Sequence, residues 1–186
     1  MQITTQMVKE LRERTGAGIM DAKRALEETG GNMDQAAAVL RQRGLDRAEK
    51  KASRVASQGL VEAYIHGGGR IGALVEVNCE TDFVARTKEF QELAHHIAMQ
   101  VAAMNPRYVS PDEIPPEVLE EGTREYGDRE LFLKQVALLC QPFIKDPKLT
   151  IGDLVKDHIA RLGENVVVRR FARFELGASA EPDGQQ

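Results

Sequence analysis

The middle of the chain contains two runs of alternating apolar residues, joined by three consecutive glycines. Val61, Ala63 and Ile65 share one face in the first run, and Ala73, Val75, Val77 and Cys79 share one face in the second. Alternation with a period of two is typical of half-buried antiparallel strands. The glycines at 67–69 predict a turn, because they lack a Gly-Lys-Ser/Thr ending and open into a strand, whereas a phosphate-binding loop opens into a helix. The sequence therefore predicts a β-hairpin.

Helical patterns precede the hairpin. Three apolar stripes with helical spacing are separated by glycines, with Thr4 placed to cap the first helix and Gly44 placed to end the third. Three helices this short predict a compact bundle of the ubiquitin-associated type, which is more often a docking module than a catalyst. A charged linker helix is expected to follow at 45–56.

Helices also follow the hairpin. We expect a long helix from about Val84 to Met104, helices at about 116–126 and 128–141, and a further helix that Thr150 caps and Gly163 ends. A final strand from Asn165 to about Leu176 should turn its even-numbered face to the core, with Arg170 as the anomaly on that face.

These elements predict the α+β class: an N-terminal three-helix bundle and a core in which helices cover a small antiparallel sheet. The predicted domains are a ubiquitin-associated-like bundle at 1–44, the linker helix at 45–56, an α+β core at 57–176 and a disordered tail at 177–186. The core is the expected dimerisation domain.

Composition restricts the class of protein. The 186 residues carry a net charge of −4, which argues weakly against nucleic acid as the main partner. No apolar run approaches the ~20 residues that span a bilayer, and the N-terminus does not resemble a secretory signal, so we expect a cytoplasmic protein that does not bind membranes. Cys79 and Cys140 are far apart, and the expectation is two free thiols rather than a disulfide or a zinc site.

Catalytic chemistry finds little support in the sequence. No HExxH, GxSxG, P-loop or dinucleotide-binding motif is present. His95 and His96 are adjacent, so they point about 100° apart on a helix and cannot share one metal ion. We therefore expect no catalytic residues, no metal ligands, no cofactor and no enzymatic activity.

The junction between the second strand and the long helix reads Asn78-Cys79-Glu80-Thr81-Asp82-Phe83-Val84-Ala85-Arg86. Residue types alone permit two interpretations. Thr81 or Asp82 could cap the helix while Phe83 covers the end of the core. Alternatively, Phe83 could enter a pocket on a partner, with Asp82 as an accompanying charge.

This junction resembles the signature of the bacterial elongation factor Ts family. Three further segments resemble the same family, in the same order along nearly the whole chain: Leu11 to Lys23, Gln141 to Asp146, and Gly163 to Phe171. Long members of that family carry a second core half and an inserted helical hairpin. This chain is similar to the short members, which work as homodimers.

The resemblance implies a guanine nucleotide exchange factor that binds elongation factor Tu–GDP, displaces magnesium and promotes GDP release during translation elongation. It implies that Thr81, Asp82, Phe83 and Val84 form the segment that enters the GTPase near its magnesium site. The N-terminal bundle would dock on the same domain through Gly18, Ile19 and Met20. A homodimer formed through the sheet is a further expectation from the resemblance.

Three other functions remain open on the residues alone. A passive adaptor would bind tightly without changing the rate at which nucleotide leaves its partner. An RNA-binding protein would use the basic residues between Arg41 and Arg54 and would show steep salt dependence. An unrecognised hydrolase would turn over substrate without Phe83.

Overall fold

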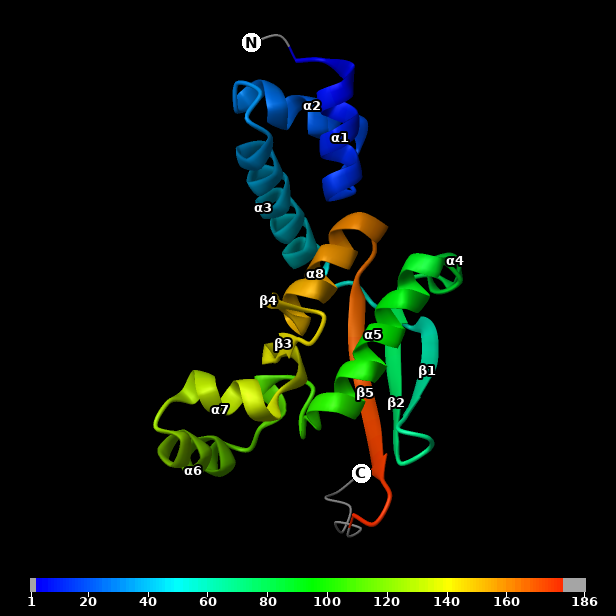
Figure 1. The fold of residues 1–186 in the computed structure, drawn as a ribbon, viewed down its shortest axis with the longest axis vertical. Coiled ribbons are helices and arrows are strands. Elements are labelled where there is room, and N and C mark those ends of the chain that lie inside the picture. The colour runs from blue at the N-terminus through cyan, green and yellow to red at the C-terminus, as the bar shows by residue number, and fades with distance from the viewer. Residues whose placement is uncertain (1–2, 179–186) are drawn as a thin grey trace.

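The computed structural model describes residues 3–178 and confirms the α+β class (Figure 1). The elements in chain order are α1 (Thr5–Thr15), α2 (Ile19–Glu28), α3 (Met33–Lys51), β1 (Gln58–His66), β2 (Ile71–Cys79), α4 (Asp82–Ala85), α5 (Lys88–Met104), η1 (Pro111–Glu113), α6 (Pro116–Tyr126), α7 (Arg129–Val136), η2 (Leu138–Cys140), β3 (Pro142–Phe143), β4 (Asp146–Thr150), α8 (Ile151–Leu162) and β5 (Val166–Glu175). The predicted tail at 177–186 lies, apart from its first two residues, outside the described part of the chain.

The elements form an elongated molecule. Figure 1 shows α1 and α2 at one end, with α3 leading from them to a body built from the sheet, α5 and α8. Helices α6 and α7 form a hairpin that projects from the other side of this body. The chain therefore has a helical head, a mixed body and a lateral hairpin.

The helical head has its own small core, built from six buried side chains: Leu11, Ala22, Ala25, Leu26, Ala36 and Leu40. Thr4 caps α1 as predicted, because its side chain accepts a hydrogen bond from the backbone N–H of Met7. Gly16 ends α1 with φ of 69°, a left-handed conformation that glycine adopts without steric cost.

Gly44 does not end the third helix, so the prediction of a separate linker helix at 45–56 is wrong. Helix α3 runs without a break from Met33 to Lys51 and packs against α8. A Cβ atom on Gly44 would lie 3.0 Å from Cβ of Ala160, which is tighter than ordinary van der Waals contact. The glycine thus permits two helices to approach closely. The division into domains at 1–44 and 57–176 stays a prediction.

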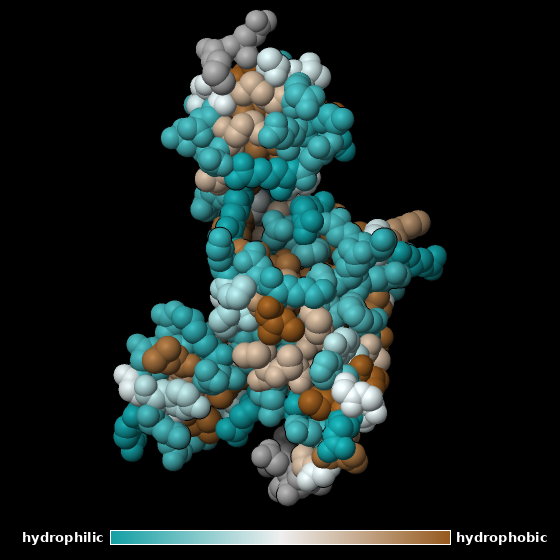
Figure 2. Space-filling model, in the orientation of Figure 1, coloured by the Kyte–Doolittle hydropathy of each residue, from teal (hydrophilic) through white to brown (hydrophobic). Residues whose placement is uncertain are grey.

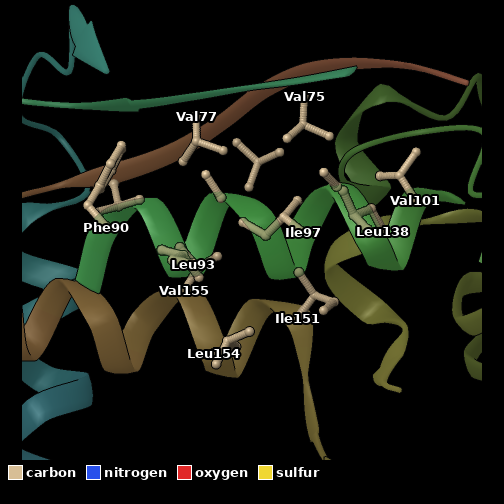
Figure 3. Close-up of a cluster of buried hydrophobic side chains, with 14 of the residues drawn as sticks. Val75, Val77, Phe90, Leu93, Ile97, Val101, Leu138, Ile151, Leu154 and Val155 are labelled. Atoms are coloured by element: carbon tan, nitrogen blue, oxygen red, sulfur yellow. The ribbon is translucent and has the colours of Figure 1, made fainter. Parts of the chain in front are cut away.

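Helix α5 lies at the centre of the body. Figure 3 shows it between the sheet, which contributes Val75 and Val77, and α8, which contributes Leu154 and Val155. Phe90, Leu93, Ile97 and Val101 of α5 are each 0% exposed. The layers are therefore sheet, α5 and α8.

The sheet is antiparallel with the strand order β1-β2-β5. Its covered face holds Ala73, Val75, Val77 and Cys79, as the alternation in β2 predicts. On β1, however, the apolar set predicted to share a face lies on the other side of the sheet. Val61 and Ile65 are each 66% exposed there, on the same face as Leu74 of β2 and Phe174 of β5. We call this side the open sheet face; its residues are Val61, Ala63, Ile65, Leu74, Glu76, Arg170, Ala172 and Phe174.

The prediction for β5 is right for its first half and wrong for its second. Val166 and Val168 are buried, but the register against β2 then shifts, because Val77 pairs with Val168 while Glu76 pairs with Arg170. Arg169 is the extra residue of a β-bulge, which moves later even-numbered positions to the other face. Phe171 therefore packs against the core, and Arg170 lies on the open sheet face, where its Nε is 2.8 Å from Oε2 of Glu76.

The helix predicted from Val84 to Met104 is interrupted. Helix α4 ends at Ala85, and α5 begins at Lys88 after Thr87, whose side chain accepts a hydrogen bond from the backbone N–H of Phe90. The second cap lets the chain change direction after only four helical residues. Phe83 and Phe90 therefore belong to different helices.

We expect Gly44→Val to lower the free energy of unfolding by about 1–3 kcal/mol, because the branched side chain would overpack the α3–α8 contact. Chemical denaturation followed by circular dichroism measures the change. Arg41→Val is the control, since it places the same β-branched residue at an exposed position of α3. Equal losses in the two variants would contradict the close-contact role of Gly44.

Candidate functional site

The turn between β2 and α4 presents Phe83 to solvent. The Phe83 side chain is 80% exposed, whereas Cys79 and Ala85 on either side of it are buried. Figure 2 shows hydrophobic surface at the corner of the molecule that α4 occupies. An aromatic ring so exposed on a soluble fold is unusual and marks a candidate contact.

Thr81 begins α4 as its N-cap. Its Oγ1 accepts a hydrogen bond from the backbone N–H of Val84 at 3.4 Å. Of the two interpretations of this junction, the capping role thus belongs to Thr81, while Phe83 does not cover the core. Val84 is half-buried and packs against the main core, so it anchors α4 while Phe83 remains in solvent.

Asp82 is the first residue of α4 and is half-exposed. Its Oδ2 lies 2.8 Å from the guanidinium of Arg86, one turn further on. Both side chains are well solvated, so this ion pair contributes little to stability. An acidic side chain next to the exposed ring is therefore available to a partner.

A contact that the sequence does not predict supports this turn. The carboxylate of Glu164 accepts hydrogen bonds from the backbone N–H groups of Glu80 and Thr81, at 3.1 and 3.0 Å, and from Oγ1 of Thr81 at 2.6 Å. Glu164 is more than 80 residues away in the chain, and no local pattern links the two segments.

The second predicted contact lies in the helical head. Ile19 and Met20 are 59% and 66% exposed, although apolar residues at the start of a helix usually enter the core. Gly18 is the N-cap of α2, and a Cβ atom there would meet nothing within 4 Å. The structure does not bring this segment together with the turn at 81–84, because α4 packs mainly on β1, β2 and α5.

The thiols and histidines in the described residues are buried or paired. Burial raises the pKa of both Cys79 and Cys140, which disfavours the reactive thiolate. His95 pairs with Glu62 at 2.9 Å, and burial lowers the pKa of His158. Within residues 3–178 no cluster of three or more His, Cys, Asp or Glu side chains is placed to hold a metal ion.

The basic residues of α3 mostly contact the protein itself. Arg43 pairs with Glu28, and Arg47 pairs with Asp21. Lys51 donates to the carbonyl oxygen of Gly163 at 2.6 Å. These contacts leave α3 without the continuous basic face that an RNA-binding helix uses.

No helix within the described range is long and apolar enough to cross a membrane.

An exposed aromatic ring on an anchored, capped turn defines a protein that presents side chains to a partner macromolecule. Comparison with known proteins supplies the particular family: the chain belongs to the elongation factor Ts family. The family model described as elongation factor TS matches residues 34–128.

Curated relatives extend this match to nearly the whole chain. The elongation factor Ts of Carboxydothermus hydrogenoformans is 56% identical, with 94% of this chain and 89% of the relative covered. That of Coprothermobacter proteolyticus is 51% identical, with 95% and 100% covered. That of a Synechococcus species is 55% identical over 97% of this chain but only 71% of the relative, so it is a longer protein.

We expect Phe83→Ala to change the free energy of unfolding by less than about 0.5 kcal/mol, because the ring is largely solvated. Phe90→Ala should cost about 3–5 kcal/mol, because that ring is 0% exposed. Urea denaturation of the two variants measures the difference. Similar losses would mean that Phe83 packs into the core.

Proposed function

We propose that this chain binds elongation factor Tu–GDP and promotes GDP release by inserting Phe83 and Asp82 into the GTPase near its magnesium site. Proteins of the elongation factor Ts family catalyse nucleotide exchange on elongation factor Tu during translation elongation. This chain belongs to that family and is therefore a nucleotide exchange factor. The observation that carries the insertion is the 80% exposed ring of Phe83 on an anchored turn. The activity belongs in the cytoplasm, where translation takes place.

The mechanism follows from how a GTPase holds GDP. Its phosphate-binding loop and a magnesium ion together neutralise the phosphate charge. Phe83 wedges between helices of the GTPase and shifts the groups that order the ion. Loss of magnesium uncovers the phosphate charge, and GDP leaves faster.

The energetics require that the chain bind the nucleotide-free GTPase more tightly than the GDP-bound form. Linkage then makes the effect reciprocal, because GDP weakens the binding of this chain by the same factor. Each tenfold of this factor corresponds to about 1.4 kcal/mol of coupling. Tight binding alone, as in a passive adaptor, would leave the rate of GDP release unchanged.

Ile19 and Met20 would supply a second contact on the same GTPase. They lie in the helical head, away from the wedge, and their exposure leaves them free to be buried by a partner. Two separate contacts would fix the orientation of the chain on the GTPase, so that the wedge enters at one place. The reaction needs no cofactor or metal ion held by this chain, and no direct contact with nucleic acid or membrane.

A second copy of this chain would cover the open sheet face. The face is apolar along two rungs of the sheet, formed by Ile65 and Phe174 and by Ala63, Leu74 and Ala172. The third rung is the Glu76–Arg170 ion pair. Two copies of such a face related by a twofold axis present the same apolar rungs to each other. The short-form family resemblance points to the same homodimer.

We expect Phe83→Ala to slow stimulated GDP release at least tenfold, because the wedge is lost while the fold is kept. Release of a fluorescent GDP analogue from elongation factor Tu, followed by stopped flow, measures the rate. Leu131→Ala is the matched control, since it removes an apolar side chain that is 53% exposed on α7. An unchanged release rate in Phe83→Ala, or an equal loss in the control, would exclude the wedge.

We expect Leu74→Glu to weaken the homodimer at least tenfold, because it places a charge at the centre of the open sheet face. Sedimentation equilibrium measures the dimer dissociation constant. Leu131→Glu introduces the same charge outside this face and should leave the constant unchanged. A monomeric parent protein, or a Leu74→Glu variant that dimerises normally, would exclude the sheet as the interface.

A further inference from the structure

The turn that presents Phe83 and the turn between α8 and β5 are joined by reciprocal hydrogen bonds. Each turn supplies a carboxylate that accepts from the backbone of the other. Glu164 accepts hydrogen bonds from the backbone of Glu80 and Thr81 and from the Thr81 hydroxyl. In return, Oε1 of Glu80 accepts a hydrogen bond of 2.6 Å from the backbone N–H of Asn165. Each turn thus satisfies backbone donors of the other, and the two cannot move independently without losing these bonds.

Glu164 accepts its hydrogen bonds from Glu80 and Thr81, the two residues immediately before Asp82 and Phe83. The ladder between β2 and β5 ends where Cys79 pairs with Val166, so the backbone of Glu80 and Thr81 lies beyond the sheet. Among residues 3–178, Glu164 is the acceptor that the structure gives to both N–H groups. Without Glu164, the backbone N–H groups of Glu80 and Thr81 would lose their acceptor, and the Glu80 side chain bonded to the N–H of Asn165 would remain as the link to the turn at 163–165.

The turn at 163–165 also contacts the end of α3, the helix that leads to the helical head. Asn165 is 3% exposed, and its Nδ2 donates to the carbonyl oxygens of Ala52 and Arg54, at 3.3 and 2.8 Å, just after α3. The guanidinium of Arg54 lies 3.6 Å from Oε1 of Glu80. The turn at 163–165 therefore contacts both the end of α3 and the base of the wedge.

We infer that Glu164 is a positioning residue for nucleotide exchange. It holds residues 80–81 so that Phe83 is presented in one orientation relative to the helical head. This inference rests on the proposed function of Phe83. Glu164 itself lies below the turn and acts through Phe83 rather than by touching the GTPase. Removing its carboxylate lets the turn adopt several conformations, and the effective affinity for the GTPase falls with the fraction that is competent to bind.

A double-mutant cycle tests the inference. Stimulated release of a fluorescent GDP analogue from elongation factor Tu is measured for the parent protein, Glu164→Ala, Phe83→Ala and the double variant. We expect Glu164→Ala to lower the apparent second-order rate constant about tenfold when Phe83 is present, and less than about twofold in the Phe83→Ala background. Loss of the effect in that background shows that Glu164 works through the ring.

Glu164→Gln separates hydrogen bonding from charge. The glutamine carbonyl oxygen can accept from both backbone N–H groups, and its amide can donate to the Thr81 hydroxyl. We expect it to recover the rate to within about threefold of the parent, although it removes the same charge as alanine does. Glu121→Ala is the control for loss of an exposed carboxylate elsewhere, on α6, and should leave the rate unchanged.

The outcomes separate the two proposals. If Phe83→Ala has no effect on release, the proposed wedge is wrong. If Phe83→Ala slows release but Glu164→Ala has no effect, or has the same effect in both backgrounds, the positioning role is overturned while the wedge stands. A Glu164→Gln variant as slow as Glu164→Ala also overturns it. If Glu164→Ala does not fold, the cycle is run with Glu164→Asp, whose carboxylate is one methylene too short, and the same outcomes decide.

Discussion

Helix α5 buries one face of a sheet that has only three strands, and the rest of the structure follows from that contact. Val75 and Val77 on β2 pack against Phe90, Leu93 and Ile97, and α8 closes the other side of the helix. A three-stranded sheet has a single helix-covered face here, so the opposite face keeps its apolar residues in solvent. One packing arrangement thus produces both a packed body and an exposed apolar face.

The same contact fixes where Phe83 lies. Strand β2 delivers Cys79 into the core, and Phe90 at the start of α5 returns to it, each with 0% exposure. The short α4 lies between these two anchors, so its outer side must face away from the body. Thr81 and Thr87 cap the two helices in turn, which allows four residues to form a separate turn of helix. The exposure of Phe83 is therefore a consequence of the buried residues on either side.

Features set by nearby residues could be predicted from the sequence. The alternation in β2, the Thr4 cap of α1 and the Thr150 cap of α8 all appear as expected, because each depends on residues within one turn or one strand. Gly44, the bulge at Arg169 and the position of Glu164 could not be predicted. Gly44 depends on Ala160, the bulge depends on pairing with β2, and Glu164 depends on a turn in another part of the chain. A glycine that permits close helix packing has the same local sequence as one that ends a helix.

An exposed aromatic ring contributes most to binding when its backbone does not have to be ordered on contact. Ordering a loop during association consumes part of the free energy that the new contact releases. Here the turn before the ring is held by hydrogen bonds to its backbone, and the turn after it is held by Val84 and Ala85 in the core. In the proposed mechanism, contact energy from Phe83 is therefore available to distort the GTPase rather than to order this chain. A protein that accelerates release must stabilise the distorted, nucleotide-free partner, so a rigid support is as necessary to it as the ring.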